Sequence, residues 1–295
     1  MRILHTSGSR VLISASAVVD ERRRKLLQFA HMKCKGCEML RNNFRRIYDR
    51  QSFMPTLQLG ILINPFFIIR RGLYKKISVF AASLDGGSLL DIGCGRKPYQ
   101  TLFNVDSYVG IDVETSGHNH KNSLVDIYYD GKEIPFPDNS FNVVVCFEVL
   151  EHVYDFKDLL IEINRVLKQR GEACISCPFV WDEHKQPYDY YRMTSFVLPK
   201  LRADCGLNVI SNLKTTTHEA TLAQMTTSYI YQTMLPKNQI FRVVLTPLLI
   251  APIKFIGFLL IKILPDSTNF YHNNVVVYEK TTESGSTEHR LAMDQ

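Results

Sequence analysis

The sequence predicts an α/β fold in which a mostly parallel sheet carries helices on both faces. Two observations predict it. Short apolar runs, such as residues 88–91 and 141–147, alternate with segments whose apolar residues follow helical spacing. The first run ends in Asp91-Ile-Gly93-Cys94-Gly95, and a buried strand followed by a glycine turn is typical of a nucleotide-type site. The 295 residues allow one large domain with additions, or two small domains.

Composition limits the partners and the compartment. The net charge of +6 fits a phosphate-bearing or membrane-surface partner, but it is too small to indicate nucleic acid, and we expect none. The seven cysteines are an odd number and lie mostly in predicted strands and turns. This pattern favours a reduced cytosolic protein over a disulfide scaffold.

Residues 1–63 are predicted to form a basic, partly helical extension, and no secretory signal is expected. The basic residues form either a solvated helix face or a contact for anionic lipid or substrate. Cys34-x-x-Cys37 resembles half of a zinc site. The similarly spaced Cys174 and Cys177 fall in a predicted central strand, where side chains alternate in direction, so a joint four-cysteine site is not expected.

A helix is predicted to begin at Asn64-Pro65 and to end before Gly86-Gly87. Its apolar stripe, which should cover the sheet, consists of Ile69, Leu73, Ile77 and Phe80.

Strand one ends at Asp91 and is followed by Gly93 and Gly95, after which Pro98 predicts the start of a helix. A dinucleotide fingerprint beginning at Gly93 would need glycine at position 98. The second strand, residues 108–111, ends in Asp112, about twenty residues beyond Gly93, where a carboxylate can meet ribose hydroxyls. Residues 124–126 are predicted as the third strand.

The motif Asp91-x-Gly93-x-Gly95 resembles motif I of the class I S-adenosylmethionine (SAM) methyltransferases. Residues 134–153, which include Phe147-Glu148-Val-Leu-Glu151-His152-Val, are very close to the "LPFPDNSFD…EVLEHV" region of the type 11 methyltransferase domain, with Asn142 in place of the usual aspartate. The resemblance extends over residues 64–213. It implies a Rossmann-like sheet of seven strands whose last strand is antiparallel, and SAM as the cofactor. The cofactor residues that it implies are Asp91, Gly93, Gly95, Asp112, Asp126, Phe147 and Glu148.

The turn from Gly95 to Tyr99, with Lys97 in place of a third glycine, and residues 178–194 resemble a bacterial subgroup associated with cell-surface polysaccharide and glycolipid biosynthesis. Residues 178–194 should lie over the crevice at the carboxyl ends of the strands. Their aromatic residues suit a sugar or another polar acceptor, or they form a packed lid with one structural salt bridge. The predicted acceptor residues are Tyr99, Trp181, Tyr188, Tyr190, Tyr191 and Arg192.

Methyl transfer from a sulfonium needs little more than positioning and, for a hydroxyl acceptor, removal of a proton. The predicted catalytic residues are His152, His184 and Asp189. The spacing of Glu148, Glu151 and His152 predicts one helical face. This set resembles the divalent-metal site of ubiquinone-pathway and small-RNA O-methyltransferases, with His184 as a fourth ligand for Mg, Mn or Zn. In metal-free relatives with the same sequence motif, the first glutamate lies near the cofactor, and the histidine packs against the protein or acts as a base.

Residues 193–205 are predicted as a helix closed by Gly206, residues 207–211 as the sixth strand and residues 274–280 as the last strand. Between them lies an apolar, helical insertion, residues 214–270, and residues 281–295 read as a disordered tail.

The most apolar part of the insertion, Gln239 to Leu264, contains two prolines and a central lysine, which count against a membrane-spanning helix. On a helix its polar and small residues, Arg242, Thr246, Lys254 and Gly257, would form a narrow stripe. We therefore expect a segment that lies in the membrane interface. A buried homodimer contact is the alternative.

Together these features predict a cytoplasmic methyltransferase, peripheral on the inner face of the membrane, that O-methylates a glycan, glycolipid or other lipid-linked acceptor. A small-molecule or quinone-like acceptor is an alternative. An alternative from a different functional class is a non-catalytic subunit that binds a partner through the insertion. The intact Asp91, Gly93, Gly95 and Asp112 argue against that class.

Overall fold

The computed structural model describes residues 47–114, 123–202, 204–265 and 267–281. The chain divides into two units, Met1–Asp49 and Arg50–Gln295, and every helix and strand named below belongs to the second. Residues 1–46, which carry most of the basic residues of the predicted extension and the pair Cys34 and Cys37, lie outside the described residues, as does the tail from residue 282.

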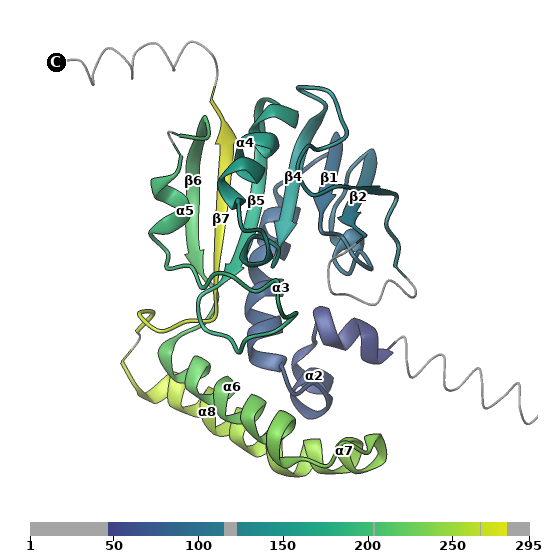
Figure 1. The fold of residues 1–295 in the computed structure, drawn as a ribbon. Helices are drawn as coiled ribbons and strands as arrows, with labels where there is room; N and C mark the ends of the chain where they lie inside the picture. Colours follow the sequence, from purple (N-terminus) through teal and green to yellow (C-terminus); the bar gives the residue numbers. More distant parts are fainter. Residues whose placement is uncertain (1–46, 115–122, 203, 266, 282–295) are drawn as a thin grey trace, which may run out of the picture. The chain divides into compact units, whose positions relative to one another are not determined.

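Seven strands form one sheet in the order β3-β2-β1-β4-β5-β7-β6 (Figure 1). Strands β1 to β5 pair in parallel, and β7 runs antiparallel to both β5 and β6. The predicted fold class, including the antiparallel last strand, is confirmed. The strands are β1 (Ser88–Ile92), β2 (Ser107–Val113), β3 (Ile127–Tyr129), β4 (Phe141–Phe147), β5 (Leu167–Pro178), β6 (Leu207–Lys214) and β7 (Asn273–Lys280).

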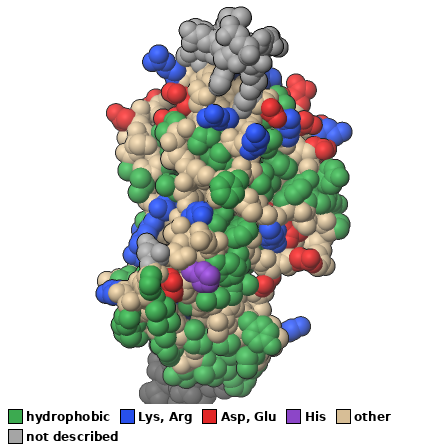
Figure 2. Space-filling view, turned by 90° about the vertical axis from the view of Figure 1, so that its left-hand side faces the viewer, with side chains coloured by type: hydrophobic (Ala, Val, Ile, Leu, Met, Phe, Trp, Pro, Cys, Tyr) green, Lys and Arg blue, Asp and Glu red, His purple; other side chains and the backbone are tan. Residues whose placement is uncertain are grey.

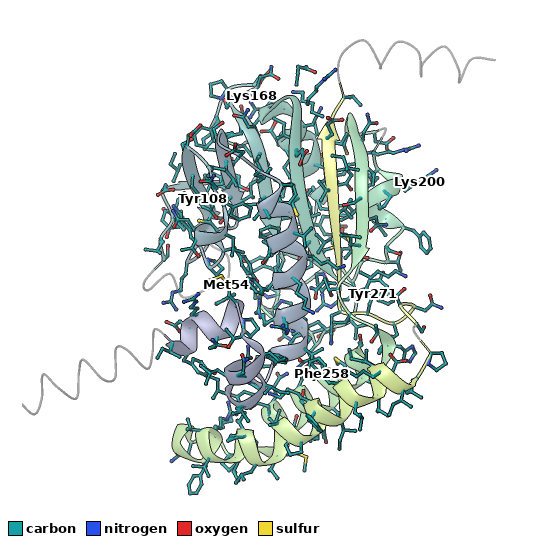
Figure 3. All side chains as sticks on the ribbon, turned by 180° about the vertical axis from the view of Figure 1, so that it is seen from behind. Met54, Tyr108, Lys168, Lys200, Phe258 and Tyr271 are labelled. Atoms are coloured by element: carbon teal, nitrogen blue, oxygen red, sulfur yellow. The ribbon has the colours of Figure 1, made fainter. Side chains whose placement is uncertain are left out.

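Helices cover both faces of the sheet, because neighbouring strand residues point to opposite sides. Leu89 packs against α3 (Phe67–Ala82), whereas Leu90 belongs to the cluster under α4 (Phe156–Val166) and α5 (Val197–Lys200). Cys174 and Cys177 fall in different clusters, so they do not form one half of a metal site. Figure 3 shows α3 lying along its face of the sheet.

The predicted stripe of α3 is confirmed: Ile69, Leu73, Ile77 and Phe80 are all buried. The helix begins at Phe67, after a turn in which the Phe66 amide donates to Asn64 Oδ1 (2.8 Å).

Three predicted elements differ from the structure. After Pro98 the chain forms only a 3₁₀ turn, η1 (Gln100–Leu102), and no α-helix. Strand β3 begins at Ile127, directly after Asp126, whose carboxylate accepts a hydrogen bond from the Gly110 amide of β2 (2.7 Å). The helix expected over residues 193–205 shortens to α5.

The shortening of α5 has a local cause. The Met193 amide donates to the Pro178 carbonyl (3.0 Å) and the Ser195 amide to the Tyr271 hydroxyl (2.7 Å). These two bonds hold the first residues of the segment against neighbouring chain, and the helix begins after them, at Val197.

The insertion folds as a helical hairpin, residues 218–263, beside α2 (Leu57–Ile63) and α3 (Figure 1). Its two ends meet where the His218 amide donates to the Ser267 carbonyl (2.9 Å). The first arm contains α6 (His218–Tyr229) and the π-helical η3 (Ile230–Met234), and the second contains α7 (Gln239–Leu245), the π-helical η4 (Thr246–Ile250) and α8 (Ala251–Ile263).

The second arm of the hairpin turns its polar stripe inward. Thr246, Lys254 and Gly257 are buried, and Lys254 Nζ donates to the Asn64 carbonyl (2.8 Å). The central lysine therefore faces the protein. Residues 241–263 are long and apolar enough to cross a membrane, with a mean hydropathy of 2.2.

Ten large apolar side chains of this arm are exposed instead, and we call them the apolar face. Figure 2 shows hydrophobic side chains gathered over the lower part of the molecule, where the hairpin lies in Figure 1. The apolar face consists of Phe241, Val243, Val244, Leu248, Leu249, Phe255, Ile256, Leu259, Leu260 and Ile263. Leu57, Leu59 and Leu62 of the neighbouring α2 are also exposed.

Candidate functional site

A cavity of about 540 Å³ opens at the carboxyl ends of β1, β2 and β4. Strand order reverses between β1 and β4, and such a reversal is where open α/β sheets bind ligands. The residues predicted for the site that line the cavity are Asp91, Gly93, Gly95, Tyr99, Asp112, Phe147, Glu148, Trp181 and His184.

The turn after β1 depends on its two glycines. Gly93 has a φ of 70°, and a Cβ there would lie 2.4 Å from Val149 Cγ2. Gly95 has a φ of 48°, yet no described atom lies within 4 Å of its Cβ position. The backbone at Gly95 therefore borders open space, which suits the close approach of a ligand.

Lys97, which replaces the third glycine of the motif, adopts the left-handed conformation with a φ of 49°. Its ammonium pairs with Asp126, and its side chain crosses β2 at Gly110, where a Cβ would lie 2.5 Å from Lys97 Cε. Asp126 is thus held by Lys97 and by the Gly110 amide, and it does not line the cavity.

Asp91 and Asp112 place two buried carboxyl groups on the cavity wall. The Tyr108 hydroxyl donates to Asp91 Oδ2 (2.6 Å), and burial raises the pKa of Asp91 to about 7. Asp112 accepts hydrogen bonds from the amides of Gly95 (3.2 Å) and Val113 (2.8 Å). A cationic ligand beside Asp91 would favour its ionised form, and hydroxyl groups would find acceptors on both residues.

Glu148 follows β4 with a φ of 57° and points toward β5 and β7. Its carboxylate accepts hydrogen bonds from Ser176 Oγ and Asn273 Nδ2, both at 2.6 Å. Its left-handed backbone precedes the short 3₁₀ helix η2 (Leu150–His152). The prediction that Glu148, Glu151 and His152 share one helical face is therefore wrong.

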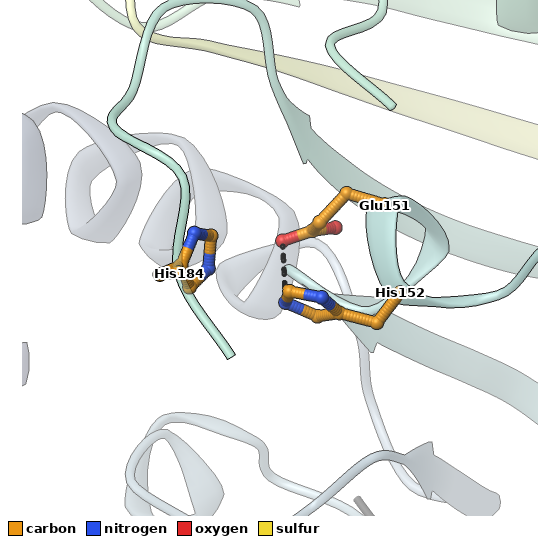
Figure 4. Close-up of side chains that lie close together, drawn as sticks. All are labelled: Glu151, His152 and His184. Carbon is orange, nitrogen blue, oxygen red and sulfur yellow. Dashed lines mark ion pairs between the residues drawn. The ribbon is translucent and has the colours of Figure 1, made fainter. Parts of the chain in front are cut away.

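Glu151 and His152 instead lie beside His184, which comes from the loop after β5 (Figure 4). One ligand atom of each residue lies within 4.8 Å of the others. Glu151 is 1% exposed, and neither of its carboxyl oxygens has a hydrogen-bond partner among the described residues. His152 Nε2 also lacks such a partner and lies 3.5 Å from Glu151 Oε1. One carboxylate and two imidazoles form a donor set that fits a divalent cation, without Glu148.

His184 is the predicted catalytic residue that reaches the cavity wall, while His152 and Asp189 do not line it. The His184 amide donates to Asp189 Oδ2 (2.8 Å), and the same oxygen lies 3.4 Å from His184 Nδ1. Burial lowers the pKa of His184, so its ring is neutral at pH 7 and can accept a proton.

Arg192 holds Asp189 through two bonds of 2.8 and 2.7 Å. Burial acts to raise the pKa of Asp189, but the bonds from Arg192 and from the His184 amide outweigh it and lower the pKa to about 2. This is a structural salt bridge, as expected if residues 178–194 form a packed lid.

The other aromatic residues of the segment pack on the protein rather than line the cavity. Tyr191 donates to the Tyr154 carbonyl (2.9 Å), and its ring centroid lies 5.1 Å from that of Phe156 at the start of α4. Tyr190 packs edge-on against the Tyr154 ring at 5.5 Å. Tyr190, Tyr191 and Arg192 are thus part of a packed segment, and the Tyr188 side chain is exposed. Trp181 alone among the aromatics of residues 181–192 lines the cavity.

Three cationic residues on the cavity wall, Arg70, Arg96 and Lys185, were not predicted as site residues. Arg70 belongs to α3, and its guanidinium carbon lies 4.9 Å from the Phe53 ring centroid. Burial lowers the pKa of Lys185, which also feels the charges of Glu151, Asp112 and Glu148. The location of Lys185, directly after His184 in the segment expected over the crevice, was the signal available in the sequence. No such signal existed for Arg70, because helical spacing places it on the solvent side of a helix that covers the sheet.

Comparison with known proteins gives one family match: residues 90–175 match the family described as a methyltransferase domain. A protein of Mycolicibacterium smegmatis named "probable S-adenosylmethionine-dependent methyltransferase" is 33% identical over 39% of this chain and 46% of its own length. The fatty-acid O-methyltransferase of the same organism is 27% identical over 37% of this chain and 41% of its own length.

Across the first relatives, the chain spans about half the length of the curated proteins that it matches. Among solved structures, the [4+2]-cyclase SpnF gives a TM-score of 0.46 with 16% identity and covers 79% of this chain and 97% of its own.

Proposed function

We propose that this chain is a SAM-dependent methyltransferase. The observation that carries the proposal is the cavity at the reversal of strand order, bounded by the glycine turn and by Asp91 and Asp112 at the ends of β1 and β2. The Asp112 carboxylate is suited to accept hydrogen bonds from the ribose hydroxyls. The open space at Gly95 suits the close approach of the cofactor. The methyltransferase-domain match and the methyltransferase names of the relatives support the same function.

Bound SAM supplies an activated methyl group on a sulfonium sulfur. The residues of this chain then have to hold an acceptor hydroxyl in line with that group and to take its proton. His184 is suited to the second task, because it is neutral and lines the cavity. The Asp189 carboxylate near Nδ1 favours the tautomer with a proton on Nδ1, which leaves Nε2 as the acceptor.

The acceptor that we propose is a glycan, glycolipid or other lipid-linked molecule. Trp181 and Tyr99 in the cavity wall suit a sugar ring, and the apolar face suits a lipid. A small-molecule or quinone-like acceptor is the alternative. Mass spectrometry of glycolipids from cells with and without the gene should show a species that loses one methyl group when the gene is deleted. Identical spectra would contradict this acceptor.

We also propose that the hairpin attaches the protein to the inner face of the membrane without crossing it. The strand before the hairpin, β6, and the strand after it, β7, pair in one sheet, so a single crossing would separate two paired strands. The inward-facing Lys254 and the exposed apolar face support an interfacial position. The proposed compartment is therefore the cytoplasm.

A divalent cation is the alternative proposal for the same site, in which His184 is a ligand and not the base. Glu151, His152 and His184 would hold the cation, and it would acidify and orient an acceptor hydroxyl. A chelator is then expected to abolish turnover, and magnesium, manganese or zinc to restore it. Titration of the ligand-free protein with the same ions gives a second readout, in which His184→Ala should remove the binding. Full turnover in the presence of a chelator would contradict the metal site. His152 would then pack against the protein or act as a base.

A further inference from the structure

The π-helical segment η3 borders the cavity on one side and solvent on the other. Gln232 lines the cavity, whereas Met234 of the same segment and the preceding Tyr229 are 66% and 62% exposed. Met234 leads within a few residues to α7, where the apolar face begins. In sequence, η3 and the short connection to α7 thus link the cavity to the arm that carries the apolar face.

Aromatic and polar contacts join η3 to the rest of the cavity wall. The Phe66 ring lies edge-on to Trp181 and to Tyr231, with centroid distances of 5.7 Å in both cases. Gln232 Nε2 donates to Asp182 Oδ2 (3.0 Å). Three distant parts of the sequence therefore build this side of the cavity: the start of α3, the loop after β5 and the first arm of the hairpin.

A cation lies beside the same wall. The guanidinium carbon of Arg242 lies 4.6 Å from the Tyr231 ring centroid, and Arg242 Nε donates to the Pro236 carbonyl (2.9 Å). These contacts fix the charge of α7 next to η3. Anionic lipid headgroups are attracted to such a position when an apolar face lies in the membrane interface.

We propose that the acceptor enters the cavity beside η3, directly from the membrane. Its polar head lies between Trp181 and Gln232, and its apolar chain follows the hairpin into the bilayer. This inference rests on the proposed methyltransferase function, and it names the acceptor class as a membrane-resident amphiphile rather than a water-soluble sugar. Gln232 then becomes a residue that determines which acceptors enter.

The test uses SAM with a tritiated methyl group and two acceptor preparations from cells that lack the gene, in which the acceptor is unmethylated. One is the total lipid extract formed into vesicles, and the other is the aqueous metabolite extract. The wild-type protein is expected to label the vesicles. Gln232→Trp, which fills the entrance, should lower the rate of lipid labelling by about tenfold or more, while the affinity for S-adenosylhomocysteine stays unchanged.

Thr233→Trp is the matched control, because Thr233 is exposed on the same segment and does not line the cavity. It should label lipid at the wild-type rate. Label in the aqueous extract alone or in neither preparation would overturn the inference, and so would equal lipid labelling by Gln232→Trp and the wild type. Failure of the wild type to bind S-adenosylhomocysteine would contradict the methyltransferase proposal itself, so the two failures are distinguishable.

Discussion

Replacing Leu248, Phe255 and Ile256 with glutamine is expected to move the protein from the membrane fraction to the soluble fraction. These three side chains are 63%, 65% and 55% exposed on the apolar face. Burial of each in the bilayer contributes about 1.5–3 kcal/mol, so their joint loss should lower the membrane partition coefficient by several orders of magnitude. High salt or alkaline carbonate should also release part of the wild-type protein, because the proposed attachment does not span the bilayer. Flotation with vesicles measures the partition.

The choice of these positions depends on the structure. Helical spacing alone would also select Phe258, but its side chain points toward α3 (Figure 3) and its ring centroid lies 5.8 Å from that of Phe67. A polar residue there would disrupt the packing of the hairpin.

A control variant replaces Val79, Phe196 and Ile210, which are exposed on other elements, with glutamine and should stay membrane-bound. Unchanged binding of S-adenosylhomocysteine shows that each variant is folded. A wild-type protein without any membrane fraction, together with a dimer that the first variant abolishes, would show that the apolar face is a homodimer contact.

Asp112→Ala is expected to weaken the binding of SAM and S-adenosylhomocysteine by about 1–3 kcal/mol. The buried Asp112 carboxylate lines the cavity, and its removal leaves the ribose hydroxyls without acceptors. Isothermal titration calorimetry measures the loss.

Asp126→Ala is the matched control, since Asp126 is held by Lys97 and lies outside the cavity lining. It should cost less affinity than Asp112→Ala. Equal losses would show that the third strand contributes a ligand, as the sequence alone predicts.

The sheet could be predicted because each buried strand carries its own apolar run. The last strand, Asn273–Lys280, remained recognisable even after a long insertion. The helix expected after Pro98 could not be excluded in this way. Its loss is associated with the left-handed Lys97, whose side chain crosses β2 to reach Asp126, a contact between residues far apart in the sequence.

The part of the site proposed for the cofactor was more predictable than the part proposed for the acceptor, for the same reason. Asp91, Gly93 and Asp112 lie at strand ends, so their strands alone bring them together. Arg70 and Gln232 reach the cavity from α3 and from the hairpin, and only tertiary packing places them there.

The hairpin shows what cannot be predicted from amino-acid composition. Its apolar character was evident, but the direction of Lys254 was not, because its hydrogen-bond acceptor is the Asn64 carbonyl, 190 residues away in sequence. A lysine in the middle of an apolar helix counts against a membrane contact only if it faces the lipid. Here it faces the protein, and the apolar side chains around it are exposed.

The most direct test of the proposed methyltransferase function is calorimetric titration of the purified full chain with S-adenosylhomocysteine and, separately, with NAD. Saturable binding of S-adenosylhomocysteine is expected, since the glycine turn and the buried Asp91 and Asp112 all border the cavity. No binding of NAD is expected, because Pro98 replaces the last glycine that a dinucleotide turn needs. Binding of NAD without binding of S-adenosylhomocysteine would contradict the proposed function.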